Sequence, residues 1–240
     1  MIDRSFLEKI EEMSASVETL VAHNAIYAPK PVYLVEEPAP DALPVHSLTA
    51  IVDYCLNMAS KEAADNRRFF INVVSPGMVI AFSGLSGANR TREEYMRSTL
   101  SVDSFPFGID MAVEKFIIAL QSQFVPSDNV SAILKVVGNI TAEAEQKTLD
   151  DGVSQQITAK TGIATVKNVT LPNPITLAPY RTFHEIDQPE SKFVLRINAK
   201  VGEKPTVSLH EADGGAWKNT AILSIKEWLV NELTDVTVLA

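Results

Sequence analysis

Apolar side chains recur at intervals of three and four residues near the start of the chain, and this spacing predicts an amphipathic helix over residues 3–24. The stripe consists of Phe6, Ile10, Met13, Val17 and Leu20. It follows the a and d positions of a heptad repeat over about two and a half heptads, fewer than a sustained coiled coil shows. Two interpretations are open: a helix lying on its own core, or an arm that packs on a neighbouring subunit.

A proline-rich stretch follows the predicted helix and continues to residue 46. Proline removes a backbone donor and breaks helices, so the stretch predicts an extended linker. Residues 1–46 are therefore predicted to form a helical arm with its linker. Residues 47–240 are predicted to form a single α+β domain.

Beyond the linker, segments with helical spacing alternate with short segments in which apolar residues recur at every second position. Helical spacing predicts four helices, over residues 48–64, 110–124, 127–138 and 216–233. Turn formers such as Pro76-Gly77 and Thr161-Gly162 separate the predicted strands and indicate hairpins. The expected fold is α+β, with a largely antiparallel sheet and the helices packed to one side of it. Ser47 and Asp110 are predicted helix caps.

Charge and composition narrow the classes of protein. The chain has 240 residues and a net charge of −9, which argues against a surface that neutralises phosphates. No apolar run approaches the length of a membrane span, and no secretory leader is apparent, so we expect a cytoplasmic protein. Cys55 is the single cysteine, which excludes an intrachain disulfide, and its place in an apolar stripe predicts a core residue.

No motif of catalysis, cofactor binding or metal binding is recognisable in the sequence. The loop from Ser83 to Asn89 lacks the lysine of a phosphate-binding loop, and the four histidines show no metal-ligand spacing. Two groupings join a histidine to nearby carboxylates, and they could meet if their segments pair: His184-Glu185 with Asp187, and His210-Glu211 with Asp213. We expect no enzyme and no cofactor.

The best candidates for a contact site are Tyr180, Arg181 and Phe183, which lie among prolines in the β-rich half of the chain. Aromatic residues and arginine are enriched at the energetic centres of interfaces. Three interpretations are open: an anchor inside the chain's own core, a subunit interface, and a stacking site for a ligand or a single nucleic-acid strand.

Five arginines form a second candidate, because antiparallel pairing could bring some of them to one edge of the sheet: Arg67, Arg68, Arg90, Arg92 and Arg97. One interpretation is an anion-binding patch. The others are solvated loop charges and salt bridges to the acidic arm of a neighbouring subunit.

Six segments together resemble one family. They are F-I-I-A-L-Q-S-Q-F from Phe116, V-V-G-N-I from Val136, D-D-G-V-S-Q from Asp150, L-P-N-P-I-T-L-A-P-Y-R-T-F from Leu171, Q-P-E-S-K-F-V-L-R from Gln188 and E-A-D-G-G-A-W from Glu211. As a set they are similar to the YfdQ-like family of phage and prophage proteins over about residues 105–233. The resemblance implies a phage or prophage origin and the cytoplasm of a bacterial host. It implies no catalytic residues.

These observations favour a non-enzymatic, self-assembling homo-oligomer. One alternative is an accessory protein of phage recombination or replication that binds DNA or a recombination protein, although the acidic charge argues against direct contact with nucleic acid. Another is a counter-defence protein that binds a nucleotide or another small ligand.

Overall fold

The computed structural model describes residues 4–14, 20–22, 25–27, 41–57, 69–85, 90–138, 146–150, 155–159, 169–198 and 205–240. The chain divides into two units, residues 1–40 and residues 41–240. No helix among the described residues combines the length and the apolar character that crossing a bilayer requires.

The first unit contains one short helix and one hairpin. Helix α1 spans Arg4–Ser14, and strands β1 (Leu20–Ala22) and β2 (Ala25–Tyr27) pair antiparallel. The prediction of one helix over residues 3–24 was therefore wrong. After Ser14 the sequence turns to β-branched residues, which favour extended backbone, and Leu20 belongs to a strand. Val17 and the side chains of Phe6 and Met13 lie outside the described residues.

A five-stranded sheet begins the second unit. Its order is β14-β4-β5-β6-β3, with β4–β5 and β5–β6 antiparallel and the two outer strands parallel to their neighbours. The strands are β3 (Leu43–Val45), β4 (Phe69–Ser75), β5 (Met78–Ser83), β6 (Glu94–Thr99) and β14 (Thr237–Leu239). The β4–β5 hairpin across Pro76-Gly77 is as predicted. Strand β3 was not predicted, and it pairs with β6 although it lies in the expected linker.

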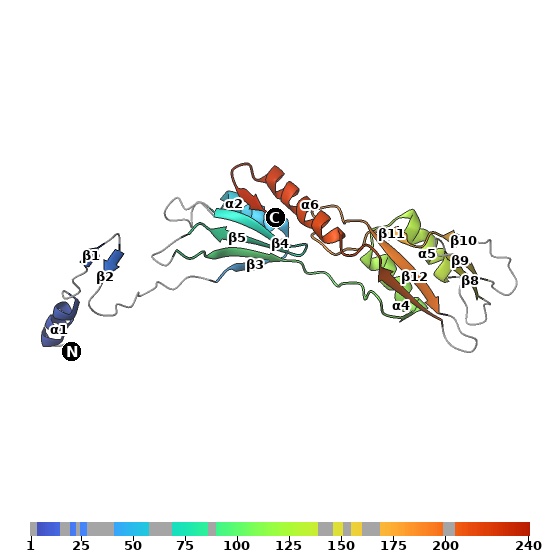
Figure 1. Cartoon of the computed structure of the whole chain (residues 1–240), viewed down its shortest axis with the longest axis horizontal. Helices are drawn as coiled ribbons and strands as arrows, with labels where there is room; N and C mark the ends of the chain where they lie inside the picture. The colour runs from blue at the N-terminus through green and yellow to red at the C-terminus, as the bar shows by residue number, and fades with distance from the viewer. Residues whose placement is uncertain are drawn as a thin grey trace. The chain divides into compact units, whose positions relative to one another are not determined.

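Two helices cover one face of this sheet. They are α2 (Leu48–Asn57) and α6 (Trp217–Glu232), and they join the sheet in the first hydrophobic core (Figure 1). The sheet contributes alternate side chains such as Ile71, Val79 and Met96, and α6 contributes Ile225 and Leu229. Because successive strand side chains point to opposite faces, the other face of the sheet carries the residues between these.

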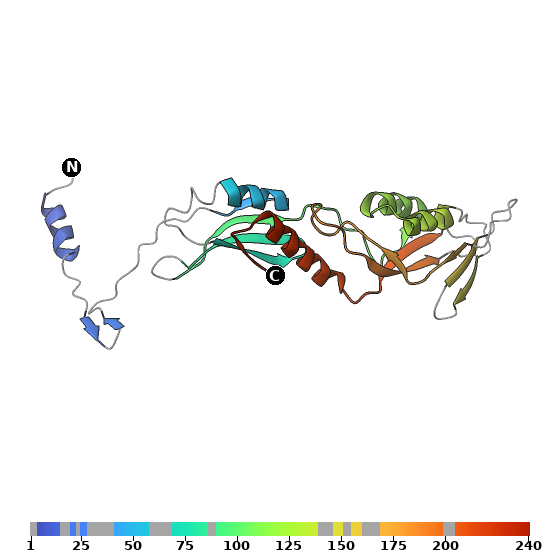
Figure 2. The ribbon, with the colours of Figure 1, turned by 90° about the horizontal axis from the view of Figure 1, so that it is seen from above.

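A four-stranded antiparallel sheet of order β11-β12-β13-β7 supports the second core. Its strands are β7 (Met111–Ala112), β11 (Ile175–Leu177), β12 (Ser191–Asn198) and β13 (Thr206–Glu211). Helices α4 (Val113–Gln123) and α5 (Asp128–Gly138) pack on it (Figure 2). Phenylalanine rings hold this core together, with Phe124 1% exposed and edge-on to Phe105. As its flanking prolines predicted, β11 is an edge strand.

A smaller antiparallel sheet has the order β10-β9-β8, built from β8 (Gln146–Asp150), β9 (Gln155–Ala159) and β10 (Val169–Leu171). The predicted pairing of the strands on either side of Thr161-Gly162 is confirmed, while the turn lies outside the described residues.

The α+β class is confirmed, but the strands do not form one sheet. Each large sheet has its own core, because each carries its own pair of helices.

The helix predicted from residue 110 starts at Val113, since Met111 and Ala112 form the edge strand β7. Asp110 therefore caps no helix, and it accepts a hydrogen bond from Asn198 at 3.1 Å. Ser47 does cap α2: its hydroxyl accepts the N–H of Ala50 at 3.2 Å.

Candidate functional site

Residues 180–190, here called the 180–190 connection, join β11 to β12 of the four-stranded sheet and contribute to the first core. The chain leaves the four-stranded sheet after β11, and Phe183 and Ile186 then pack in the first core. The hydroxyl of Thr182 donates to the carbonyl of Pro76, in the β4–β5 turn, at 2.6 Å. At Ser191 the chain returns to the four-stranded sheet. The connection thus ties the two cores together.

One glutamine organises the connection. The Gln188 side-chain oxygen accepts the backbone N–H groups of Arg181, at 3.0 Å, and Thr182, at 3.2 Å. Its amide nitrogen donates to the carbonyls of Thr182, Phe183 and Ile186. A turn without regular secondary structure needs such partners, because buried backbone groups are costly to leave unpaired.

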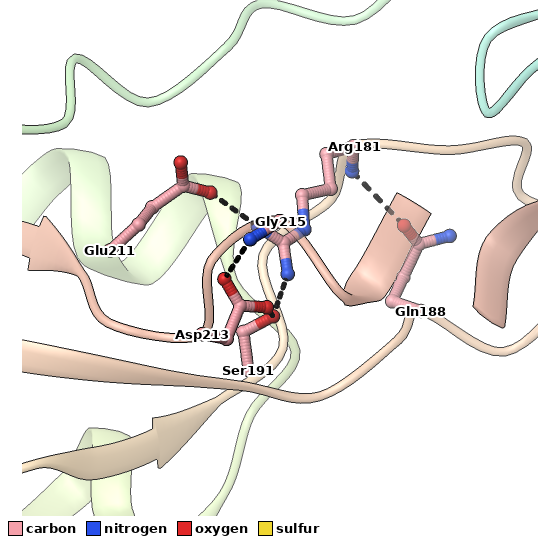
Figure 3. A network of polar contacts seen from close by, with 6 residues as sticks. All are labelled: Arg181, Gln188, Ser191, Glu211, Asp213 and Gly215. Atoms are coloured by element: carbon pink, nitrogen blue, oxygen red, sulfur yellow. Dashed lines mark hydrogen bonds and ion pairs between the residues drawn. The ribbon is translucent and has the colours of Figure 1, made fainter. Parts of the chain in front are cut away.

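Arg181, whose side chain is largely buried, is the centre of a polar network (Figure 3). Its side chain is 8% exposed, and one terminal nitrogen donates to the Glu211 carboxylate at 2.7 Å while the other donates to the Ser191 hydroxyl. The guanidinium carbon lies 3.8 Å from the centre of the Trp217 ring and 5.7 Å from that of Phe193. Ionic hydrogen bonds and a stacked ring together hold the charge in place.

Asp213 extends this network to the start of α6. One carboxylate oxygen accepts the Ser191 hydroxyl at 2.7 Å and the other accepts the Gly215 N–H at 3.0 Å. Burial by itself would raise the pKa of Asp213, but hydrogen bonds from Ser191 and from the backbone of Gly215 and Trp217 outweigh it, so the pKa is lowered. Gly214 and Gly215 have φ of 63° and 80°, backbone that glycine adopts without strain.

Burial also changes the pKa of Arg181. Desolvation lowers the pKa of Arg181 to about 10, while Glu211 and Asp213 oppose the shift. Arg181 therefore stays charged at neutral pH. The polar contacts of this network are mutual, because they join Arg181, Glu211, Ser191 and Asp213 to one another. This is the arrangement of a structural network that fastens α6 and β12 to the 180–190 connection.

Glu185, in the same connection, stabilises the beginning of α2. Its carboxylate accepts the N–H groups of Leu48 at 2.7 Å and Thr49 at 3.0 Å, and the Thr49 hydroxyl at 3.2 Å. A negative charge is favourable at a helix N-terminus, where backbone donors have no partner within the helix. The sequence contains no local signal for this cap, because the two partners are 137 residues apart.

These contacts decide between the interpretations of Tyr180, Arg181 and Phe183. Phe183 is 1% exposed and belongs to the first core, and Arg181 is buried against its own chain. Of the three interpretations, the anchor within the chain's own fold is therefore the one observed for these two side chains. Tyr180 is half-buried, with its ring 5.6 Å from that of His184.

Three carboxylates of the two histidine–carboxylate groupings bind groups outside those groupings. Arg181 and Ser191 hold Glu211 and Asp213, Glu185 caps α2, and a ring nitrogen of His210 lies 3.3 Å from the Ser208 hydroxyl. Over the part of the chain that the structure describes, no group of three or more histidine, cysteine or acidic residues could hold a metal ion.

Two of the arginine candidates have separate partners within the chain. Arg97 forms an ion pair with Glu94, and Arg92 lies over the Phe70 ring at 4.8 Å and donates to the carbonyl of Ser83 at 3.4 Å. Arg90 has a positive φ of 52°. Arg67 and Arg68 lie outside the described residues, as do residues 86–89 of the small-residue loop.

Cys55 lies on the buried face of α2, as predicted. Burial raises the pKa of its thiol to about 12, so little of the reactive thiolate forms near neutral pH. A role as a nucleophile is not supported.

Comparisons with protein-family models, with curated proteins and with solved structures find no match for this chain. The resemblance to the YfdQ-like family therefore stays a prediction.

Proposed function

We propose that the chain is a non-enzymatic, self-assembling protein in which α1 packs on a neighbouring copy to form a homo-oligomer. A phage or prophage origin is part of this proposal, and the sequence resemblance is its only support. The observation that carries the proposal is the exposure of two apolar residues of α1, Leu7 and Ile10.

Leu7 is 53% exposed and Ile10 is 47% exposed, and they lie three residues apart on one side of the helix. The polar side carries two exposed ion pairs, Arg4 with Glu8 and Lys9 with Glu12. Such pairs stabilise a helix by about 0.3–0.5 kcal/mol each. An 11-residue helix is marginal in water by itself, so it gains most of its stability by burying its apolar side.

The network around the buried Arg181 side chain supports the non-enzymatic part of the proposal. Its charged groups contact one another and the N-terminus of α6, and they hold two cores together. A catalytic group needs access to a substrate, whereas the Arg181 side chain is enclosed by Glu211, Ser191 and Trp217.

The mass of the full chain in solution tests the proposal. Leu7→Asp with Ile10→Asp places two carboxylates on the apolar side of α1, and we expect the mass measured by light scattering to fall toward 26.2 kDa, that of one chain. Removal of residues 1–30 should have the same effect. The matched control is Ile118→Asp, which changes an exposed isoleucine of α4 and should leave the mass as it is. A wild-type chain that is monomeric, or an assembly that survives both changes in α1, would contradict the proposal.

Two alternatives remain predictions: an accessory protein that binds DNA or a recombination protein, and a nucleotide binder. The contacts of Arg92 and Arg97 within the chain favour neither of them.

A further inference from the structure

The two hydrophobic cores have no residue in common. Among the described elements, the helices of each core make their extensive packing contacts with the strands and the helix of the same core. The described part of residues 41–240 therefore forms two lobes, a first lobe around the first core and a second lobe around the second core. Two such bodies move relative to each other unless a large apolar interface joins them, and no such interface is among the extensive contacts of the described elements.

The chain passes between the lobes in four short segments, here called the crossings. Each crossing lies between residues of different lobes, and at the first of them Leu100 packs in the first core and Phe105 in the second. None of the four contains a helix or a strand, and the last includes Gly214 and Gly215, both with positive φ. The crossings are residues 101–104, 181–182, 187–190 and 213–216.

The Arg181 side chain links the two lobes at these crossings. In the second lobe it donates to Glu211, the last residue of β13, and to Ser191, the first residue of β12. In the first lobe its guanidinium carbon lies over Trp217, the first residue of α6, at 3.8 Å from the ring centre. One side chain therefore holds the end of the four-stranded sheet and the beginning of α6 together.

Two buried donors of this contact have no hydrogen-bond partner among the described residues: Nε of Arg181 and Nε1 of Trp217. A donor that is buried without a partner lowers stability, because it has given up its hydrogen bond to water. Separation of Arg181 from Trp217 lets water reach both donors, and this gain offsets part of the stacking energy that is lost. Neither residue belongs to a hydrophobic core, so the contact can open while both cores stay packed.

We propose that the contact between Arg181 and Trp217 is a latch that fixes the orientation of the two lobes relative to each other. When the two side chains separate, the lobes move as bodies about the four crossings, and each core keeps its own packing. The position of the contact carries the inference, because Arg181 lies in one crossing and Trp217 directly follows another. The inference is independent of the proposed self-association, because all the contacts that it uses lie within one chain.

Distances between two spin labels on the full chain test the latch. In a Cys55→Ala background, Ile118→Cys places one label on an exposed position of α4 in the second lobe, and Leu223→Cys places the other on an exposed position of α6 in the first. The labelled chain is diluted into an excess of unlabelled chain, so that double electron–electron resonance measures distances within single chains. We expect a narrow distribution of distances with Arg181 present, and a broader one for Arg181→Met.

Two controls separate motion of the lobes from unfolding of one lobe. Leu56→Cys with Leu223→Cys places both labels in the first lobe, on α2 and α6, and this distribution should stay narrow in the Arg181→Met chain. Arg196→Met is the matched control for the loss of an arginine, because Arg196 is an exposed residue of β12. It should leave the distribution between the lobes as narrow as in the wild type.

Trp217→Leu opens the latch from its other side. It removes the ring but leaves the hydrogen bonds of Arg181 to Glu211 and Ser191, and it should also broaden the distribution between the lobes. Equal distributions between the lobes for the wild type and both latch variants would overturn the inference. Equal broadening within the first lobe in both variants would show unfolding in place of lobe motion, and would also overturn it. A monomeric wild type would contradict the proposed function and leave this test unaffected.

Discussion

Helix α1 and the 180–190 connection are rich in residues that favour contacts, and for both the sequence leaves open whether the partner is the chain's own core or a neighbouring subunit. The structure separates them. In the connection, Phe183 and Arg181 are enclosed by their own chain, while in α1 Leu7 and Ile10 are exposed. Apolar and aromatic content therefore predicts that a segment makes contacts, and says nothing of whether the partner lies in the same chain.

The largest expected effect on the free energy of unfolding is that of a substitution in the buried 180–190 connection. Phe183→Ala empties a site in the first core, where the ring is 1% exposed, and we expect the free energy of unfolding to fall by about 3–5 kcal/mol. Chemical denaturation measures it. Ile118→Ala, at an exposed position of α4, is the control and should cost less than about 0.5 kcal/mol. A loss of that small size for Phe183→Ala would show that the connection is not part of the core.

Arg181→Met should have the next largest effect. It removes the charged hydrogen bonds to Glu211 and Ser191 and the stacked partner of Trp217, while the Ser191–Asp213 hydrogen bond remains. Part of Glu211 is exposed and can be solvated, so we expect a loss of about 2 kcal/mol rather than the larger cost of an isolated buried charge.

A double-mutant cycle with Glu211→Gln isolates the ion pair from the packing of Arg181 on Trp217. Arg181→Lys keeps the charge but not the planar fork, and it should recover only part of the stability. Full recovery would show that the charge alone accounts for the network.

Much of the fold follows from local pattern. The helices at residues 48 and 128 and the β4–β5 hairpin were predicted because apolar periodicity, a serine cap and a Pro-Gly turn act over a few residues. Two cores in place of one sheet, and the Glu185 cap of α2, depend on residues more than a hundred positions apart and leave no local signal. The preference of β-branched residues for extended backbone also outweighed the heptad pattern, because Leu20 of the stripe belongs to strand β1.

Glu185→Ala tests the long-range cap. The variant leaves the Leu48 and Thr49 donors without the carboxylate, although Ser47 still accepts the Ala50 N–H. We expect a loss of about 1 kcal/mol in the free energy of unfolding, the usual value of a capping interaction. Glu190→Ala changes an exposed glutamate at the end of the same connection and serves as the control. Equal effects of the two substitutions would exclude a capping role for Glu185.

The lowered pKa of Asp213 predicts a smaller effect on the free energy of unfolding, one that depends on pH. Its pKa in the folded chain is lower than the ordinary value of 3.8, so the folded state favours the carboxylate. The resulting stability is present above the unfolded-state pKa and is lost as the pH falls through the folded-state pKa. Denaturation at pH 6 and at pH 3 should therefore show a larger loss for the wild type than for Asp213→Asn. Equal losses would mean that Asp213 does not favour its charged form on folding.

Ile10→Ala should have the smallest effect on unfolding and a distinct dependence on concentration. If α1 packs on a neighbouring copy, the free energy of unfolding in dilute solution should change by less than about 0.5 kcal/mol. As concentration rises, association stabilises the wild type by mass action, and the variant should fall progressively behind it. Phe183→Ala should instead show a deficit that is already present in dilute solution, because its contacts lie within one chain. If the deficit of Ile10→Ala were equally independent of concentration, α1 would pack within its own chain, and the contrast between the two regions would disappear.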